Sequence, residues 1–215
     1  MAKPAQPFIP SPEQMALWPA ESGNRINGLG ETTARRPRPI YWHDPDATPH
    51  GPLQRWFQQH NAGGALLARA RAERQQVLDM PLSPLAAAPA QRDATEWTRE
   101  LKQLALAAGA DIVGVARMQP QWVYDGFEVS QRFIVMLGVA HDYERMKTAP
   151  EEPSFAEVVT QYARGNRVAK ALASWLREQG HDARPHGGPM AGPVTLIPPA
   201  LACGFGELGK HGSII

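Results

Sequence analysis

The residues near the end of the chain are the clearest candidates for chemistry. The stretch GFGELGKHG, residues 204–212, combines four glycines with a glutamate, a lysine and a histidine. Gly204, Gly206 and Gly209 have the G-x-G-x-x-G spacing of a dinucleotide fingerprint, which needs a strand directly before it and an acidic residue about 20 positions after it. Pro-Pro and four further residues separate the preceding apolar run from Gly204, and the sequence ends at Ile215. The hypothesis of a nicotinamide-binding reductase therefore depends on this spacing alone.

The same glycines suit another kind of site. A residue without a Cβ lets the main chain approach a large, flat cofactor closely. Lys210 and His211 would then project into the site, and Glu207 could cap the turn. A P-loop is not favoured, because His211 stands where that motif needs Ser or Thr.

Cys203 is the only cysteine of the sequence. The chain can therefore form no internal disulfide and no CxxC metal site. An iron–sulfur cluster usually takes about four thiolates, which this chain alone does not have. Small apolar neighbours in PPALACGFG predict a buried structural thiol rather than a nucleophile.

Composition excludes several classes of protein. The chain has 215 residues, of which 43% are hydrophobic and 20% charged, with a net charge of +1. No strong charge or basic run with aromatics points to nucleic acid. No apolar run is long enough to span a bilayer, and the N-terminus does not resemble a secretory signal. PRPIYWHDPD, not an apolar run, follows Arg35-Arg36, so we interpret this pair as solvated loop and expect a cytoplasmic protein.

The elements that must position the candidate residues fall into two parts. Residues 1–92 are expected to form an irregular, aromatic-rich N-terminal arm that wraps the folded body. It contains one helix, residues 65–79, and a Pro/Ala linker. The arm's aromatic residues are Trp18, Tyr41, Trp42, Trp56 and Phe57.

Residues 93–215 are expected to form the folded body. A helix capped by Asp93 or Thr95, strands within 111–117 and 132–143, and a long helix capped by Ser154 follow one another. The second strand is expected to be buried on both faces. Gly165 interrupts the helical pattern, which leaves one long helix or two, and VTLIPP is expected to form a short strand. This order of elements predicts an α+β or α/β sandwich.

Four stretches of this body, taken in order, resemble one known family. They are GADIVGVARMQPQWVY, FIVMLGVAHDYERMKTAP, YARGNRVAKALASWLREQGHDARPHGG and LIPPALACGFGELGKHGSII. Together they are similar to cobalamin-dependent reductive dehalogenases over about residues 94–215. A related final stretch occurs in epoxyqueuosine reductases, but the W-V-Y and D-Y…T-A-P elements favour the dehalogenases.

The resemblance implies a nitroreductase-like α+β fold that binds cobalamin. It also implies two iron–sulfur clusters in a module that follows the Gly-rich motif, an electron-donating ferredoxin or reductase, and an organohalide substrate. Carried over by position, Tyr162 gives a proton to the carbon that loses halogen, and Lys210 is its partner. The residues expected at the cofactor are Gly204, Gly206, Glu207, Gly209, His211 and Gly212.

The proton donor has alternatives. A phenol has an ordinary pKa near 10, and a neighbouring cation lowers the cost of forming the phenolate. Tyr162 could instead be a core residue of its helix, Lys210 a solvated loop cation, and Tyr143 a rival donor. His186 and His211 are interpreted as loop histidines rather than cobalt ligands.

The sequence departs from the family in two places. The loop RPHGGPMAGP has no asparagine where the family often has one that helps to bind substrate or cofactor. Cluster-binding cysteines should follow the Gly-rich motif, so we expect either a piece of a longer enzyme or a chain paired with an iron–sulfur subunit. A homo-oligomer is the other expected assembly. A non-catalytic corrinoid-binding protein is the alternative function.

Overall fold

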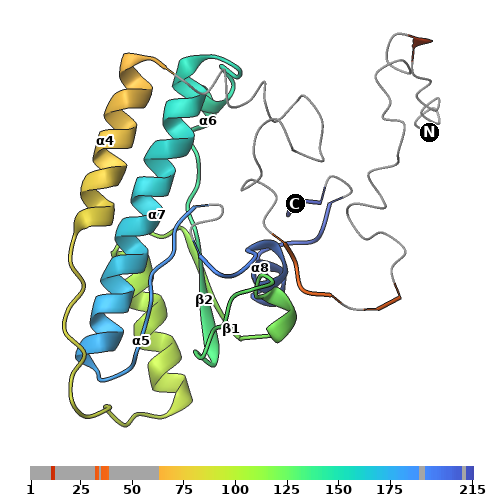
Figure 1. Ribbon diagram of the computed structural model, residues 1–215. Helices are drawn as coiled ribbons and strands as arrows, with labels where there is room; N and C mark the ends of the chain where they lie inside the picture. The colour runs from red at the N-terminus through yellow and green to blue at the C-terminus, as the bar shows by residue number, and fades with distance from the viewer. Residues whose placement is uncertain (1–10, 13–31, 34, 39–62, 189–191, 210–211) are drawn as a thin grey trace, which may run out of the picture.

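A computed structural model describes residues 11–12, 32–33, 35–38, 63–188, 192–209 and 212–215 (Figure 1). Its named elements follow in chain order: α4 (Ala65–Asp79), α5 (Ala94–Ala107), β1 (Ile112–Arg117), the 3₁₀ turn η1 (Pro120–Trp122), β2 (Phe133–Gly138), α6 (Tyr143–Met146), α7 (Glu152–Glu178) and α8 (Ile197–Ala202). None of the helices described is both long and apolar enough to cross a lipid bilayer.

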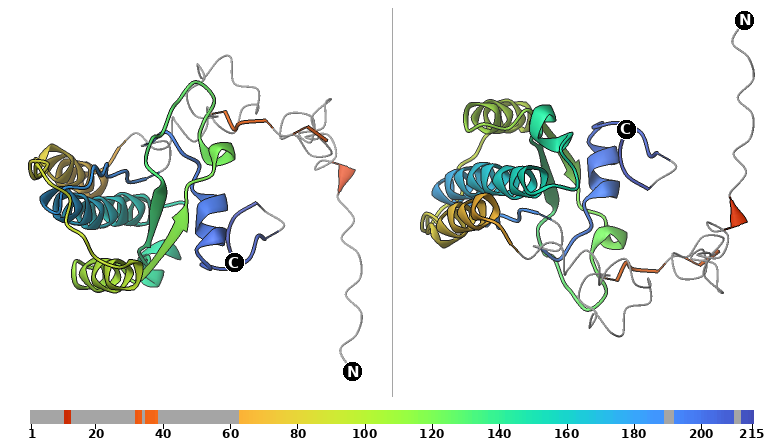
Figure 2. Two further views of the ribbon diagram at one scale, coloured as in Figure 1. Left: turned by 90° about the horizontal axis from the view of Figure 1, so that it is seen from below. Right: turned by 90° about the horizontal axis from the view of Figure 1, so that it is seen from above.

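A small antiparallel sheet lies between two layers of helix. β1 and β2 pair with Ile112 opposite Gly138 and Arg117 opposite Phe133. α4, α5 and α7 lie on one side of the sheet and α8 on the other, as both views of Figure 2 show. The described chain is thus α+β, as predicted. β2 differs from expectation: Met136 is buried, but Phe133 is 51% exposed, because the sheet is narrow and its strands end in solvent.

The main core fills the space between α5, α7 and the sheet. Its buried residues are Leu101, Ala105, Ala110, Val168 and Leu172. α5 contributes Leu101 and Ala105 to this core. The helix begins where the sequence predicted, after the cap at Asp93. The Asp93 carboxylate accepts hydrogen bonds from the amides of Thr95 (2.7 Å) and Glu96 (2.9 Å), which have no partner inside the helix.

α7 is one helix of 27 residues and not two. Of the two alternatives left open at Gly165, the undivided helix is the one observed, because glycine within a helix costs only about 1 kcal/mol relative to alanine. The predicted cap is wrong: α7 begins at Glu152, and buried Ser154 donates its hydroxyl hydrogen bond to the carbonyl of Glu151 within the first turn.

α4 has the predicted bounds and packs along α7 in the same direction. The Glu152 carboxylate of α7 accepts a hydrogen bond from the amide of Leu67 (3.0 Å) and so caps the start of α4. Gly64, before α4, has a φ of +134°, which favours glycine, and a Cβ there would lie 1.9 Å from that carboxylate and displace it. Near the other end, Lys170 donates to the carbonyl of Leu78 at 2.5 Å.

The Pro/Ala segment after α4 is also attached to α7. The amides of Ala86 and Ala90 donate to the carbonyls of Arg177 and Gln179, each at 2.9 Å. Arg177 in turn donates to the carbonyl of Ser83 at 2.7 Å. Residues 63–92 therefore pack with the body, although their composition led us to place them in the arm; the domain division at residue 92 stays a prediction.

The segment before the glycines is a helix and not the predicted strand. Val194 makes an isolated bridge with Val123, and α8 then begins at Ile197. Pro198 and Pro199 stand in the first turn of α8, where a missing amide hydrogen costs no helical hydrogen bond. A second small core of Trp122, Val123 and Val194 joins this segment to the turn after β1.

The arm is described mainly where it meets that turn. Arg36 donates to the carbonyls of Val123 (3.0 Å), Tyr124 (2.7 Å) and Phe127. The amide of Asp125 donates to the carbonyl of Pro37 at 2.8 Å. The interpretation of Arg36 as solvated loop is therefore wrong. The five arm aromatics named above lie outside the described residues.

Candidate functional site

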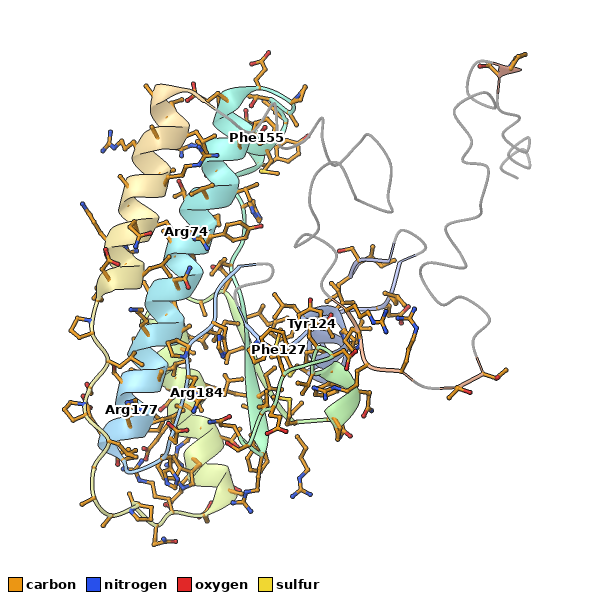
Figure 3. All side chains as sticks on the ribbon, in the orientation of Figure 1. Arg74, Tyr124, Phe127, Phe155, Arg177 and Arg184 are labelled. Atoms are coloured by element: carbon orange, nitrogen blue, oxygen red, sulfur yellow. The ribbon has the colours of Figure 1, made fainter. Side chains whose placement is uncertain are left out.

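Tyr162 lies where three segments meet. It is half-buried on α7, and the Arg74 guanidinium of α4 lies over its ring with 5.7 Å between the guanidinium carbon and the ring centroid. Figure 3 shows Arg74 at the boundary between α4 and α7. The third segment is the loop after α7, because a Cβ on Gly188 would lie 3.5 Å from Cγ of Tyr162.

Asn166 fixes this loop against α7. It is 3% exposed, and its amide nitrogen donates to the carbonyl of Tyr162 one turn earlier at 2.7 Å. A Cβ on Gly187 would lie 2.1 Å from Oδ1 of Asn166, so the loop can approach the helix this closely only with glycine at that position. The loop lacks an asparagine of its own, and the one beside it comes from α7.

The sequence analysis missed Arg74 and Asn166. The signal for Arg74 was its spacing: it falls on the same stripe of α4 as the buried residues Leu67, Ala70 and Val77. Its Nε atom is buried without a hydrogen-bond partner. The signal for Asn166 was its place four residues after Tyr162, hence on the same face of α7.

The Gly-rich segment folds back on itself. The amide of Glu207 donates to the carbonyl of Ile215 at 3.0 Å, and the amide of Gly212 donates to the carbonyl of Gly209 at 2.9 Å. A Cβ on Gly206 would lie 2.3 Å from the Ile215 carbonyl oxygen, so closure of this hairpin accounts for Gly206.

Two other glycines of the segment have open surroundings. Gly204 and Gly212 have φ values of +76° and +78°, and no atom lies within 4 Å of a Cβ placed on either. Glu207 is exposed and Gly209 is buried. Lys210 and His211 lie outside the described residues, so the pairing of Lys210 with Tyr162 stays a prediction.

Cys203 faces the sheet rather than a reaction site. A Cβ on Gly114 of β1 would lie 3.1 Å from its sulfur, so the half-buried thiol packs on the strand. Burial raises the pKa of Cys203 above its ordinary value, against the lowering effects of a hydrogen bond with the Met136 main chain and of the Lys102 charge. A protonated thiol is a poor nucleophile, which agrees with the structural role expected for it.

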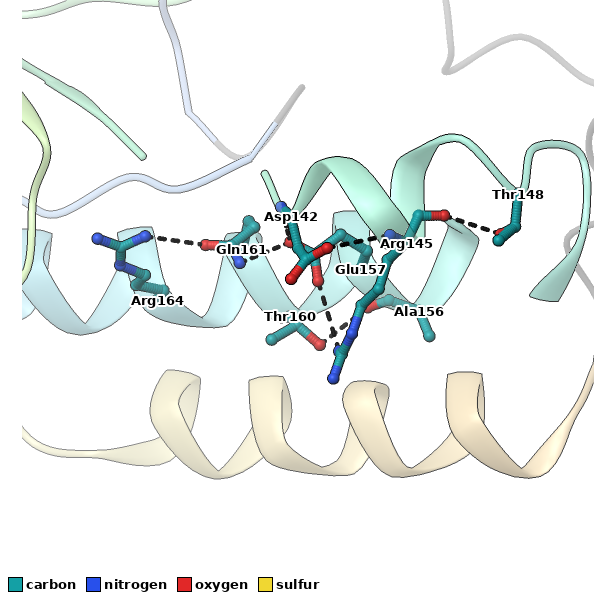
Figure 4. Close-up of polar contacts among 8 residues, drawn as sticks. All are labelled: Asp142, Arg145, Thr148, Ala156, Glu157, Thr160, Gln161 and Arg164. Atoms are coloured by element: carbon teal, nitrogen blue, oxygen red, sulfur yellow. Dashed lines mark hydrogen bonds and ion pairs between the residues drawn. The ribbon is translucent and has the colours of Figure 1, made fainter. Parts of the chain in front are cut away.

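The rival donor Tyr143 is 75% exposed at the start of α6. The nearby buried carboxylate is Glu157, 1% exposed, which accepts from the amide of Asp142 and from the side chain of Gln161, each at 2.7 Å (Figure 4). The bond from Asp142, the residue before α6, holds α6 against α7, and the bond from Gln161 lies within α7. His186 is exposed in the loop before Gly187.

The described residues fit one of the two expected cofactors in part. The open, positive-φ glycines Gly204 and Gly212 leave main chain that a large flat group can approach. An iron–sulfur cluster does not fit this chain alone, because the sequence has one cysteine. Within the described ranges, no three His, Cys, Asp or Glu side chains gather as metal ligands do.

Comparison with known proteins identifies the relatives of this chain. No family model matches it. Curated tetrachloroethene reductive dehalogenases from Desulfitobacterium hafniense and Dehalobacter restrictus are 30% identical to it over 117 residues, which is 54% of this chain. Over that stretch this chain is similar to the reductive dehalogenases. It spans about a fifth of the length of those relatives, since the match covers 20% of each.

Solved reductive dehalogenases share the fold. The catabolic reductive dehalogenase NpRdhA, in complex with 3-bromo-4-hydroxybenzoic acid, matches 73% of this chain and 24% of its own with a TM-score of 0.62 and 22% identity. Another solved structure, described as a reductive dehalogenase structure that suggests a mechanism for B12-dependent dehalogenation, matches 71% of this chain and 24% of its own with the same TM-score and identity. The predicted relationship to an oxidoreductase family is thus confirmed, while the link to epoxyqueuosine reductases stays a prediction.

Proposed function

We propose that this chain is the cobalamin-binding part of an enzyme that reductively removes halide from an organic substrate. The observation that carries the proposal is Tyr162, set among Arg74, Asn166 and Gly188 in a chain related to tetrachloroethene reductive dehalogenases. The solved neighbours, one described for B12-dependent dehalogenation and one in complex with 3-bromo-4-hydroxybenzoic acid, support it.

The reaction needs a proton as well as electrons. Two electrons and one proton replace the carbon–halogen bond by a carbon–hydrogen bond and release a halide ion. Tyr162 supplies the proton from its hydroxyl oxygen, and a neighbouring cation stabilises the phenolate that is left. Arg74 lies at the ring in the described structure, and Lys210 is the predicted second cation.

The electrons would come from cofactors, either bound by this chain or supplied by further sequence or another subunit. Cobalamin, when bound, would supply a low-potential metal centre that delivers electrons to the carbon–halogen bond. The residues proposed to hold it are Gly204, Gly206, Glu207, Gly209, His211 and Gly212. Since the chain has one cysteine, iron–sulfur clusters would have to come from further sequence or from another subunit.

The detailed fold type, the electron donor and the cellular location are also parts of the proposal. A nitroreductase-like sandwich would place the corrin beside the Gly-rich segment. A ferredoxin or a reductase would donate the electrons. A cytoplasmic location belongs to the same proposal.

Corrin retention tests the first part of the proposal. The chain is incubated with hydroxocobalamin, freed of excess by gel filtration, and its visible spectrum recorded. Gly204→Val should reduce retention about tenfold or more, because its side chain would enter the space left for the cofactor. Gly126→Val is the matched control: Gly126 also has a positive φ, +82°, with no atom within 4 Å of its Cβ position. No retention by the unaltered chain would count against the function.

Halide release tests the second part. The chain that holds corrin is supplied with a low-potential reductant and an organohalide, with and without a cluster-bearing partner. Tyr162→Phe should lower the rate of halide release by about 10² to 10⁴-fold while leaving the corrin spectrum unchanged. Corrin retention without halide release under any of these conditions would favour the corrinoid-binding alternative.

A further inference from the structure

Arg74 occupies a position where an apolar side chain would be expected. Its neighbours on the inner stripe of α4 are Leu67, Ala70 and Val77, which are 1%, 5% and 3% exposed. The Nε atom of Arg74 is buried without a hydrogen-bond partner. A buried donor left unpaired costs free energy, and a leucine or methionine at this position would avoid that cost. Packing alone therefore does not explain why position 74 is an arginine.

The contact of Arg74 with Tyr162 offers an explanation. Its guanidinium lies over the face of Tyr162, 5.7 Å from the ring centroid, within the range of a cation–π interaction. A Cβ on Gly188 would lie 3.5 Å from the tyrosine ring and 3.7 Å from Nη2 of Arg74. The loop thus covers both groups at once, which weakens screening of the charge by water.

Several other charged groups on the surrounding elements make interactions of their own. Glu73 of α4 pairs with Arg167 of α7 at 3.4 Å. Arg164 of α7 pairs with Asp111 at 3.0 Å. Arg71 of α4 and His186 of the loop also make interactions. Among the residues described, Arg74 is the cation whose charged group lies over the Tyr162 ring.

We propose that Arg74 is a positioning residue for Tyr162, whose guanidinium holds the ring in place from α4 and stabilises the phenolate that forms when the hydroxyl gives up its proton. This role rests on the proposed function for its purpose. The contact itself involves only side chains of this chain and requires no cofactor.

A titration of tyrosinate absorbance tests the proposal. The absorbance of the unaltered chain near 295 nm is followed with pH, and the curve of Tyr162→Phe is subtracted to isolate Tyr162 from the other three tyrosines. Arg74→Met should raise the midpoint by about one pH unit, which is a tenfold change in proton affinity. Arg74→Lys, which keeps the charge, should restore most of the shift.

Arg69→Met is the matched control, because Arg69 is an exposed arginine of the same helix. Far-UV circular dichroism checks that each variant is folded, and Arg74→Gln replaces Arg74→Met if the latter unfolds. An unchanged midpoint in the uncharged variant, or an equal shift in Arg69→Met, overturns the proposal. The titration is done without corrin. A raised midpoint in a chain that fails to retain cobalamin in the separate binding experiment would therefore sink the proposed function alone, and an unchanged midpoint in a chain that does retain cobalamin would sink this inference alone.

Discussion

At the scale of single residues, Asp111 shows how one carboxylate joins three elements. It precedes β1, accepts from the amide of Ala140 after β2 at 2.7 Å, and pairs with Arg164 of α7 at 3.0 Å. The hydrogen bond from Ala140, followed by that from Arg164, holds the pKa of Asp111 below its ordinary value of 3.8. The ionised form is therefore favoured by folding.

The lowered pKa fixes the sign of a pH effect. The unfolded chain binds the proton more readily than the folded one, so the stabilisation is present above pH 3.8 and is lost as pH falls through the lower folded pKa. Asp111→Asn should lower the urea midpoint at neutral pH, and the difference from the unaltered chain should shrink as pH drops below 3.8. A difference that stays constant to the lowest pH would contradict this.

The sequence predicted the residues whose contacts are with near neighbours along the chain. Asp93 was found because a cap depends on amides two and three residues away. Arg74 was missed because its partner lies on another helix, 88 positions along the chain (162 − 74), and only its place on an apolar stripe could have marked it. Arg36 was missed for a different reason: its acceptors are main-chain carbonyls, which every residue type carries.

At the scale of elements, the position of α8 depends on a glycine in β1. Gly114 is buried, and a Cβ there would lie 2.5 Å from Cβ of Cys203 and 3.0 Å from the Phe205 ring. The missing side chain lets the end of α8 sit directly on the sheet. The apolar run before α8 was predicted to be a strand because short runs of this kind do not distinguish strand from helix. The Pro-Pro pair was the better signal.

Gly114→Ala should therefore destabilise the fold by about 1–3 kcal/mol, because overpacking forces the contacting groups apart. Gly165→Ala is the matched control within α7: its Cβ would lie 3.9 Å from the nearest side-chain atom. That change should be neutral or should stabilise the chain by up to about 1 kcal/mol, since alanine is the better helix former. Thermal or urea unfolding measures both, and equal effects would contradict the prediction.

At the scale of the whole molecule, the arm fastens the turn that supports the candidate site. Arg36 binds three carbonyls of residues 123–127 (Figure 3 labels Tyr124 and Phe127). The same turn bonds to the segment before α8: the amide of Tyr124 donates to the carbonyl of Pro193, and the amide of Thr195 to that of Trp122. The loop that touches Tyr162 therefore leads into a segment that the arm stabilises.

Removing the hydrogen bonds of Arg36 should destabilise both the turn and the segment before α8. Arg36→Met should speed amide hydrogen exchange in residues 121–127 and 192–195 by about tenfold or more, because hydrogen bonds to a charged group contribute about 1.5–3 kcal/mol. Arg38→Met is the control, since its ion pair with Asp125 is long, 3.7 Å, and its side chain is 76% exposed. Exchange that is as slow in Arg36→Met as in the control would show that the arm is dispensable here.

The parallel packing of α4 on α7 has a practical consequence for anyone who shortens this chain. A fragment cut at the composition boundary, starting at Asp93, would look like a sensible minimal body. It would discard α4, and the carboxylate of Glu152 would lose the helix end that it caps. The smallest fragment that keeps the tyrosine in its native surroundings begins at or before Gly64.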